Sequence, residues 1–286
     1  MNHMKIAPAI AGLALVATLG ADSRDWKTEA REPFHYTFSS DTSLDVDNVD
    51  GHIQVTGDNS KTIRVEGERI IRAADQQELN RAKNEVRLDV NEKDGVAQLY
   101  VNGPFRGNHS NDDHGFHLHY DDHRYEVTYN FVIKVPRDLG LRLRTVNGNV
   151  DTDNTRGKFD IRGVNGAVNM RAAGGSGSLQ TVNGTAAADF AESPKGDCSF
   201  KTVNGEINTG FPASLSANVH VKTLNGGAFT DFDSTAILPA RPEAARSNGK
   251  FVFRQNHDTS LRIGSGGPDL SFQTVNGSIR IRKETK

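Results

Sequence analysis

The sequence predicts an all-β protein, a single-chain β-solenoid (β-helix) of about seven coils of 18–21 residues, with one short helix and long loop insertions. Two observations predict this fold. A five-residue motif of the form x-Thr-Val-Asn-Gly occurs six times with small variations, and apolar residues alternate with polar ones on both sides of it. A repeat of this length is typical of one coil in a stack of short strands.

Every copy of the motif ends in Asn-Gly. The first four intervals between successive asparagines are 18, 18, 21 and 21 residues, and the last is 51. Gly adopts positive φ at no steric cost and Asn tolerates it, so each pair is expected at a corner between two strands. The predicted structural turn residues are Asn147, Gly148, Asn165, Gly166, Asn183, Gly184, Asn204, Gly205, Asn225, Gly226, Asn276 and Gly277.

The identity of the corners favours stacked coils over an antiparallel meander with Asn-Gly hairpins, which would show the same local pattern. Equivalent turns of a meander lie two strands apart and gain nothing from being identical. In stacked coils they lie about 4.8 Å apart, where Asn amides can form a ladder of hydrogen bonds. A second stack is expected from the threonines of the motif, which Gly163 replaces once: Thr145, Thr181, Thr202, Thr223 and Thr274.

The apolar residues of each repeat recur with a period of two. Phe159 and Ile161 precede the second copy, and Val168 and Met170 follow it. This period indicates strands with one inward face. An earlier segment, Val49-Asp50-Gly51-His52-Ile53, has the same shape with Asp in place of Asn. The 51-residue interval contains Ser247-Asn248-Gly249 followed by Lys-Phe-Val-Phe, which predicts one further degenerate coil.

The chain before the repeats has a different pattern. Strands are expected at 34–38, 62–72 and 125–135, and a hairpin at 86–90 and 96–101. Residues 75–83 predict a helix with Asp75 as its cap. We expect these segments to form the first coils of the same stack. The predicted organisation is a signal peptide at 1–21, a linker at 22–33, a β-rich part at 34–135 with a His-rich loop at 103–124, and solenoid repeats at 136–286.

The first 21 residues are typical of an export signal. Residues 1–5 carry one positive charge, residues 6–19 are an apolar run of 14, and Gly20 and Ala21 follow. Such a run is shorter than the roughly 20 residues that span a bilayer. The chain is therefore expected to be exported to the periplasm, the cell envelope or the extracellular space, with no stable membrane span after cleavage.

Composition excludes other classes. The formal net charge is −2 and the sequence has no basic block, so nucleic acid is not an expected partner. Cys198 is the one cysteine, which rules out an intramolecular disulfide and predicts a buried thiol.

Two stretches resemble the bacterial family of "putative adhesin" β-helix proteins known as DUF4097. They are the run Val132-Ile-Lys-Val-Pro-Arg-Asp-Leu-Gly-Leu-Arg-Leu-Arg-Thr-Val-Asn-Gly148 and the glycines at 264–267 before the last motif. The resemblance covers about residues 34–283. It implies secretion, a β-helical fold and no established catalytic residues. The chain differs from a minimal member by its His-rich insertion and by the insertion at 235–246.

The His-rich insertion is the one segment with metal-binding chemistry. Residues 109–123 hold five of the ten histidines, and His117 and His119 alternate with apolar neighbours, so they would share one face of a strand. A third His or a carboxylate could complete a Zn²⁺ or Cu²⁺ site. A solvated polar loop is the alternative, because the spacing matches no fixed metal motif. The candidate ligands are His114, His117, His119, His123 and Asp121.

Outward charges suggest two further surfaces. The acids Asp151, Asp153, Asp160 and Asp189 could supply the carboxylate pair of a glycosidase, although scattered acids are expected on any solvated strand. A basic stripe for acidic glycans could form from Arg142, Arg144, Arg162, Arg171, Lys201 and Lys222.

The sequence thus predicts a secreted or periplasmic, non-enzymatic β-solenoid without a cofactor, which presents surfaces for binding a protein or a cell-envelope glycan. The alternatives are an envelope metal-binding protein that uses the His-rich loop and a carbohydrate-active β-helix enzyme.

Overall fold

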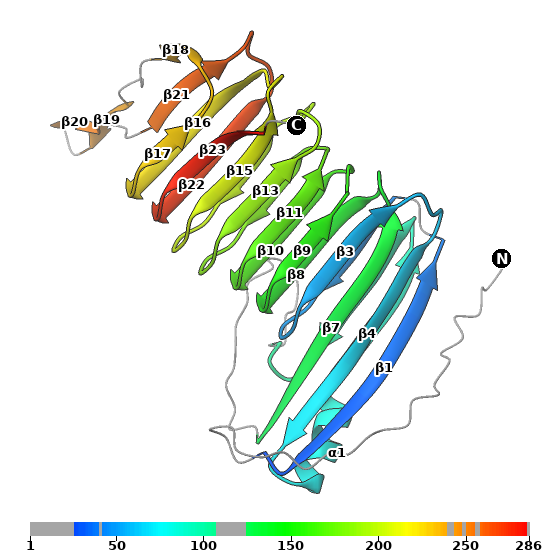
Figure 1. The fold of residues 1–286 in the computed structure, drawn as a ribbon. Coiled ribbons are helices and arrows are strands. Elements are labelled where there is room, and N and C mark those ends of the chain that lie inside the picture. Colours follow the sequence, from blue (N-terminus) through cyan, green and yellow to red (C-terminus); the bar gives the residue numbers. More distant parts are fainter. Residues whose placement is uncertain are drawn as a thin grey trace.

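The computed structural model describes residues 26–39, 42–106, 124–238, 243–247, 250–254 and 258–284. These residues form strands almost throughout, with one α-helix, and two large mixed sheets contain most of the strands (Figure 1).

The ten-stranded sheet contains, in spatial order, β1 (Thr28–Phe38), β4 (Ile63–Ala73), β7 (Tyr125–Pro136), β3 (Ile53–Asp58), β9 (Val150–Asp153), β11 (Val168–Ala173), β13 (Ala186–Phe190), β15 (Ile207–Pro212), β23 (Ile279–Glu284) and β17 (Ala228–Thr230).

The eleven-stranded sheet contains, in spatial order, β18 (Ser234–Leu238), β21 (Asp258–Ile263), β16 (Ala217–Asn225), β22 (Asp269–Asn276), β14 (Cys198–Lys201), β12 (Gly177–Gln180), β10 (Phe159–Asn165), β8 (Gly140–Asn147), β2 (Ser43–Asp47), β6 (Val96–Asn102) and β5 (Arg87–Lys93). A separate two-stranded sheet pairs β19 (Glu243–Ser247) with β20 (Lys250–Arg254).

Each repeat in the middle of the chain gives one strand to each sheet. Strands β8, β10, β12 and β14 pair in parallel in one sheet, and β9, β11, β13 and β15 do so in the other. The inward side chains of both sheets form one core. The ring centroids of Phe190, in the ten-stranded sheet, and Phe200, in the other sheet, lie 6.1 Å apart. Phe200 also stacks on Phe272, with 5.0 Å between ring centroids. The period-two alternation therefore supplies one buried layer between the sheets.

The N-terminal part differs from the expected first coils. Strands β2 and β3 pair in parallel with β8 and β9, but β4 pairs antiparallel with both β1 and β7. The expectation of parallel coils throughout is wrong here, because these long strands reverse direction at each step. Strand β1 begins at Thr28, inside the segment expected as a linker. The hairpin β5–β6 turns at Asp94 and Gly95, which both have positive φ.

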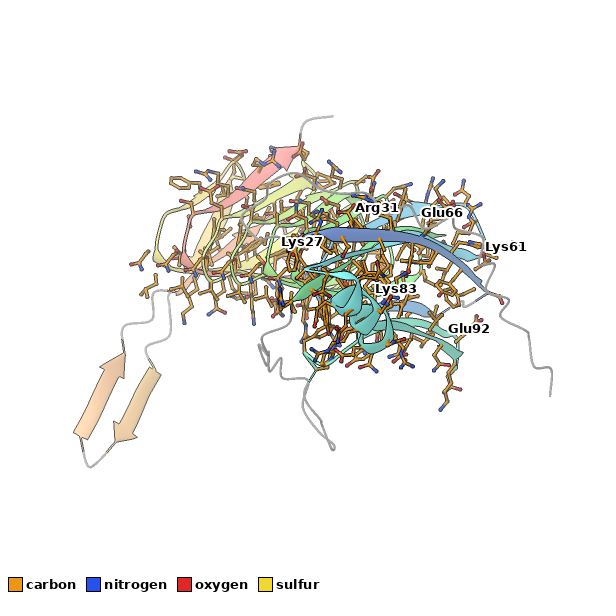
Figure 2. All side chains as sticks on the ribbon, turned by 90° about the horizontal axis from the view of Figure 1, so that it is seen from below. Lys27, Arg31, Lys61, Glu66, Lys83 and Glu92 are labelled. Atoms are coloured by element: carbon orange, nitrogen blue, oxygen red, sulfur yellow. The ribbon has the colours of Figure 1, made fainter. Side chains whose placement is uncertain are left out.

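The predicted helix is present as α1 (Gln76–Glu85), and Asp75 accepts a hydrogen bond from the Glu78 amide at 2.9 Å. An ion pair joins the helix to the sheet: Lys83, labelled in Figure 2, lies 2.8 Å from Glu32 of β1. Arg69 of β4 donates to the Ala82 carbonyl at 3.1 Å. The helix and the long antiparallel strands close this end of the two sheets.

We call the pair of strands that one motif joins a level. The spatial order of the levels at the C-terminal end differs from the order of the motifs in the sequence. Strand β22 lies between β14 and β16, so the last motif is inserted between the fourth and the fifth. The degenerate coil expected at residues 247–253 is also wrong, because β19 and β20 form an antiparallel hairpin. The motifs are nearly identical, so the motif sequence alone does not determine their spatial order.

The asparagines of the six motifs form one continuous ladder that starts at Asp50. Each side-chain amide donates to the side-chain oxygen of the level before it, in the order Asp50, Asn147, Asn165, Asn183, Asn204, Asn276 and Asn225. The six N···O distances are 2.6, 2.9, 2.9, 2.8, 2.7 and 2.8 Å. Asp50 can only accept when ionised, so it is suited to the first position of the ladder.

The motif glycines are required mainly by close approach of the backbones. Gly148, Gly166 and Gly277 have positive φ, as expected, but the other three motif glycines do not. A Cβ on any of the six would overlap a backbone carbonyl oxygen in the neighbouring level. The motif threonines occupy equivalent positions in neighbouring levels, as Thr223 and Thr274 do by register. Their hydroxyls donate to glycine carbonyls of the neighbouring level, as Thr181 does to Gly166 at 2.9 Å.

Substitutions at one corner test the asparagine hydrogen bonds and the close approach at the glycine. Asn183→Ala removes two ladder hydrogen bonds at an exposed position, so we expect a loss of about 1–2 kcal/mol in the free energy of unfolding. Gly184→Val should cost more, about 3 kcal/mol, because its Cβ meets the Gly166 carbonyl. Thermal and urea unfolding measure both, and Val182→Ala is the control with an expected change within about 0.5 kcal/mol. Equal stability of Gly184→Val and the control would contradict the close-approach argument.

The first residue of the ladder gives a pH prediction. Burial raises the pKa of Asp50 above its ordinary value of 3.8, and the hydrogen bond from Asn147 opposes this only in part. A raised pKa in the folded state means that ionisation destabilises the fold, so this contribution to stability is present below pH 3.8 and is lost as the pH rises. Asp50→Asn should therefore raise the melting temperature at pH 7, and the gain should vanish below pH 3.8.

Melting curves from pH 3 to pH 8 measure this effect. The control is Asp153→Asn, which changes an exposed carboxylate at the end of β9. A variant Asp50→Asn that melts at or below the parent temperature at pH 7 would contradict the prediction.

Candidate functional site

The register between levels arranges outward residues of the eleven-stranded sheet into rows. Between β10 and β16, five neighbouring strands place three positions each on this surface, and the parallel pairing aligns equivalent positions. We call this surface the ribbon. Its levels are Asp160, Arg162 and Val164; Ser178, Gln180 and Val182; Ser199, Lys201 and Val203; Ser271, Gln273 and Val275; and His220, Lys222 and Leu224.

The three middle levels of the ribbon offer unpaired polar groups. Gln180 donates to Ser178 at 2.6 Å within one level. Within the part of the chain that the structure describes, the side chains of Ser199, Lys201 and Gln273 have no hydrogen-bond or ion-pair partner. Lys201 and Gln273 are exposed. These hydroxyl, amide and ammonium groups can therefore bind a ligand without breaking an internal contact.

An apolar row runs beside the polar rows. The residue before each ladder asparagine is Val or Leu. Val182 is 37% exposed, Val203 39% and Leu224 68%, whereas Val164 and Val275 are half-buried. At the first motif the equivalent Val146 is buried. A row of exposed apolar side chains beside polar groups makes this face a candidate contact surface.

The charges at the N-terminal end of the same face are paired. Arg162 lies 2.9 Å from Asp160, and Arg144 lies 3.6 Å from Asp47. Arg142 lies 3.6 Å from Asp45, whose pKa burial raises. Lys201 is thus the single charged side chain of the three middle levels. The ribbon is a polar surface with a weak positive charge.

On the outer face of the ten-stranded sheet, more of the charged side chains have a hydrogen-bond or ion-pair partner. Asp151 accepts from Asn169 at 2.9 Å, Asp189 lies 2.6 Å from Arg282, and Arg280 lies 2.7 Å from Glu206. The acids considered for a carboxylate pair are divided between the sheets, since Asp160 lies on β10 whereas Asp151, Asp153 and Asp189 lie on β9 and β13.

The expected basic stripe is only partly assembled. Arg171 lies on β11 of the ten-stranded sheet and so is not on the same face as Lys201. Arg142 and Arg144 are on the right sheet but are paired with acids. Sequence reasoning missed the serine and glutamine rows. Their signal is the recurrence of Ser or Gln three and five residues before the motif asparagine, as in Ser178 and Gln180.

Cys198 is buried in the core at an inward position of β14. Burial raises the pKa of its thiol to about 11, so the thiolate is scarce at neutral pH.

The candidate metal ligands His114, His117, His119, His123 and Asp121 lie outside the described residues, as does the predicted signal peptide at 1–21. Among the described residues, no group of three or more His, Cys, Asp and Glu side chains could hold a metal ion. No helix in the described ranges is long and apolar enough to cross a membrane.

Comparisons with known proteins give two similar solved structures. One is a "putative cell adhesion protein" from Clostridium sporogenes ATCC 15579, with 9% identity, coverage of 88% of this chain and 100% of that chain, and a TM-score of 0.40. The other is a "putative adhesin" from Bacteroides fragilis NCTC 9343, with 11% identity, coverage of 88% and 97%, and a TM-score of 0.31. No protein-family model and no curated protein matches the chain.

Proposed function

We propose that this chain is an exported, non-enzymatic β-solenoid of the DUF4097 type that binds a linear cell-envelope glycan along the ribbon. The observation that carries the proposal is the set of unpaired polar side chains in the three middle levels, beside a row of exposed valines. The function is adhesive: the protein holds a polymer and requires no cofactor.

The repeat of the ribbon matches a polymer better than a small molecule. Neighbouring levels are separated by about 4.8 Å, so five levels extend over roughly 19 Å. The same chemical groups recur along that length, which lets a repeating chain make equivalent contacts at several positions. Several weak contacts of this kind add through multivalency.

The chemistry of the ribbon favours a glycan over a protein partner. Hydroxyl and amide side chains exchange hydrogen bonds with sugar hydroxyls, and the valine row can pack against the C–H face of a sugar ring. Protein interfaces depend on aromatic and Arg anchors at their centre. The three middle levels contain neither residue type. Lys201 adds a preference for a polymer that carries carboxylates or other acidic groups.

Charge reversal on the ribbon tests the proposal. Lys201→Glu should weaken binding of an acidic polysaccharide about 3- to 10-fold and reduce its salt dependence, because an exposed charge contributes about 1 kcal/mol. The matched control is Lys61→Glu, which makes the same change at an exposed residue far from the ribbon (Figure 2). Affinity is measured by calorimetry on an array of neutral and acidic polysaccharides. Equal losses in both variants, or none in Lys201→Glu, would reject the ribbon as the binding face.

Export has a separate test. The apolar run at 6–19 should direct the chain out of the cytoplasm and be removed, so the mature protein should begin between Thr18 and Asp22. Cell fractionation with N-terminal sequencing measures this. A chain that still begins at Met1 in the cytoplasmic fraction would contradict the proposal.

A further inference from the structure

The two ends of the sheets are closed differently. At the N-terminal end, β4, β1 and α1 follow the last parallel strands. At the other end, β17 is the terminal strand of the ten-stranded sheet and has only three residues, all exposed. In the five motif levels before the last, the glycine amide donates to the next level, as Gly277 does to the Asn225 carbonyl at 3.0 Å. By the same pattern the amides of Gly226 and Ala228 point beyond the last level, toward an open edge.

The opposite sheet extends past this edge by two strands. Beyond β16, the eleven-stranded sheet continues with β21 and β18, and the ten-stranded sheet has no strand opposite them. The inner face of β21 is correspondingly less covered than that of β16. Val219 and Val221 are buried, whereas their register partners Leu261 and Thr259 are partly buried and exposed. Among the described residues, the ten-stranded sheet therefore has two strands fewer than the opposite sheet at this end, and we call these the missing strands.

Within the described ranges, one hairpin lies outside the two large sheets. Strands β19 and β20 pair with each other and stand apart from the rest in both views (Figures 1 and 2). An isolated two-stranded hairpin is marginally stable in water, so it gains stability by adding to a larger sheet. Its two strands equal the number missing from the ten-stranded sheet.

The segments that connect the hairpin to β18 and β21 are short and allow it to add to the ten-stranded sheet. Four residues join β18 to β19 and three join β20 to β21. Asp258, where β21 begins, pairs with Lys222, which lies three residues before Asn225 at the corner that leads into β17. A three-residue link reaches about 10–14 Å, and facing sheets lie about 10 Å apart. The hairpin can therefore pass from one sheet to the other at the corner.

Strand direction fits as well. Strand β17 runs away from the corner, and β21 starts at the corner because it is antiparallel to β16. The chain that leaves β20 must arrive at the corner to enter β21, so β20 would run antiparallel to β17. This arrangement repeats the antiparallel closure that β4 and β1 give the other end.

We propose that the open edge of β17 is a docking site for the hairpin β19–β20 of the same chain. In the docked state β20 pairs antiparallel with β17, β19 lies outside β20, and the two strands cover the inner faces of β21 and β18. The hairpin acts as a detachable end cap: when it leaves, it exposes a strand edge to which another chain can add.

Hydrogen exchange on the full-length mature chain tests this docking. The amides of Gly226, Ala228 and Thr230 should be protected in the parent protein. Val252→Pro removes a donor at the centre of β20 and should increase their exchange rate by about 10-fold or more. Val252→Thr keeps the amide and the β-branched shape, so it is the matched control and should leave the protection unchanged. Unchanged protection of β13 and β15 shows that the body of the variant is folded.

The second variant is Ala245→Pro, in β19, for the case in which Val252→Pro does not fold. Equal exchange of the β17 amides in the parent and in a folded proline variant overturns the proposal. Light scattering at several concentrations distinguishes the source of the hairpin. A monomer with protected amides supports docking within one chain. A dimer that the proline variant abolishes overturns it in favour of hairpin exchange between two copies.

Discussion

The structure depends on the contact between successive Asn-Gly corners. Each asparagine amide bonds to the side-chain oxygen of the neighbouring level, and each glycine lies against a backbone carbonyl that leaves no room for a Cβ. Together these contacts fix both the distance and the register between levels. Because the register is fixed, residues two and four positions before the corner asparagine are aligned into inward rows, and residues three and five positions before it are aligned into outward rows. The core and the ribbon therefore follow from the same constraint.

Much of this could be predicted from the sequence, because the local pattern determines it. The period of two around Phe159 and Ile161 predicts strands, and the identity of the corners predicts the ladder. The reason for the glycines could not be read in the same way. Positive φ is a property of one residue, whereas the approach of Gly184 to the Gly166 carbonyl is a property of two levels. The antiparallel strands β4 and β1 also carry the same alternation as parallel ones, so the sequence does not distinguish their direction.

The candidate site also has features that the sequence predicts and features that depend on neighbouring levels. Lys201 is recognisable in the sequence as an outward cation, but its lack of a partner depends on which residues the neighbouring levels place beside it. Arg144 has the same position in its repeat and is paired, because β2 brings Asp47 to the adjacent row. An outward charge becomes available for a ligand only where the flanking levels carry serine and glutamine. The composition of three consecutive repeats, rather than any single residue, defines the ribbon.

A stack with a fixed register leaves an unpaired strand edge at each end. The two ends of this chain cover these edges in different ways. At the beginning, Asp50 accepts the first amide of the ladder, and β4, β1 and α1 cover the edge. At the end, the chain inserts β22 beneath β16, so its last motif lies inside the stack while Asn225 occupies the terminal level. The C-terminal strand β23 is thereby held between β15 and β17. The exposed edge is left to β17, which lies 13 residues before the hairpin β19–β20 in the chain, close enough for the same segment to supply its cover.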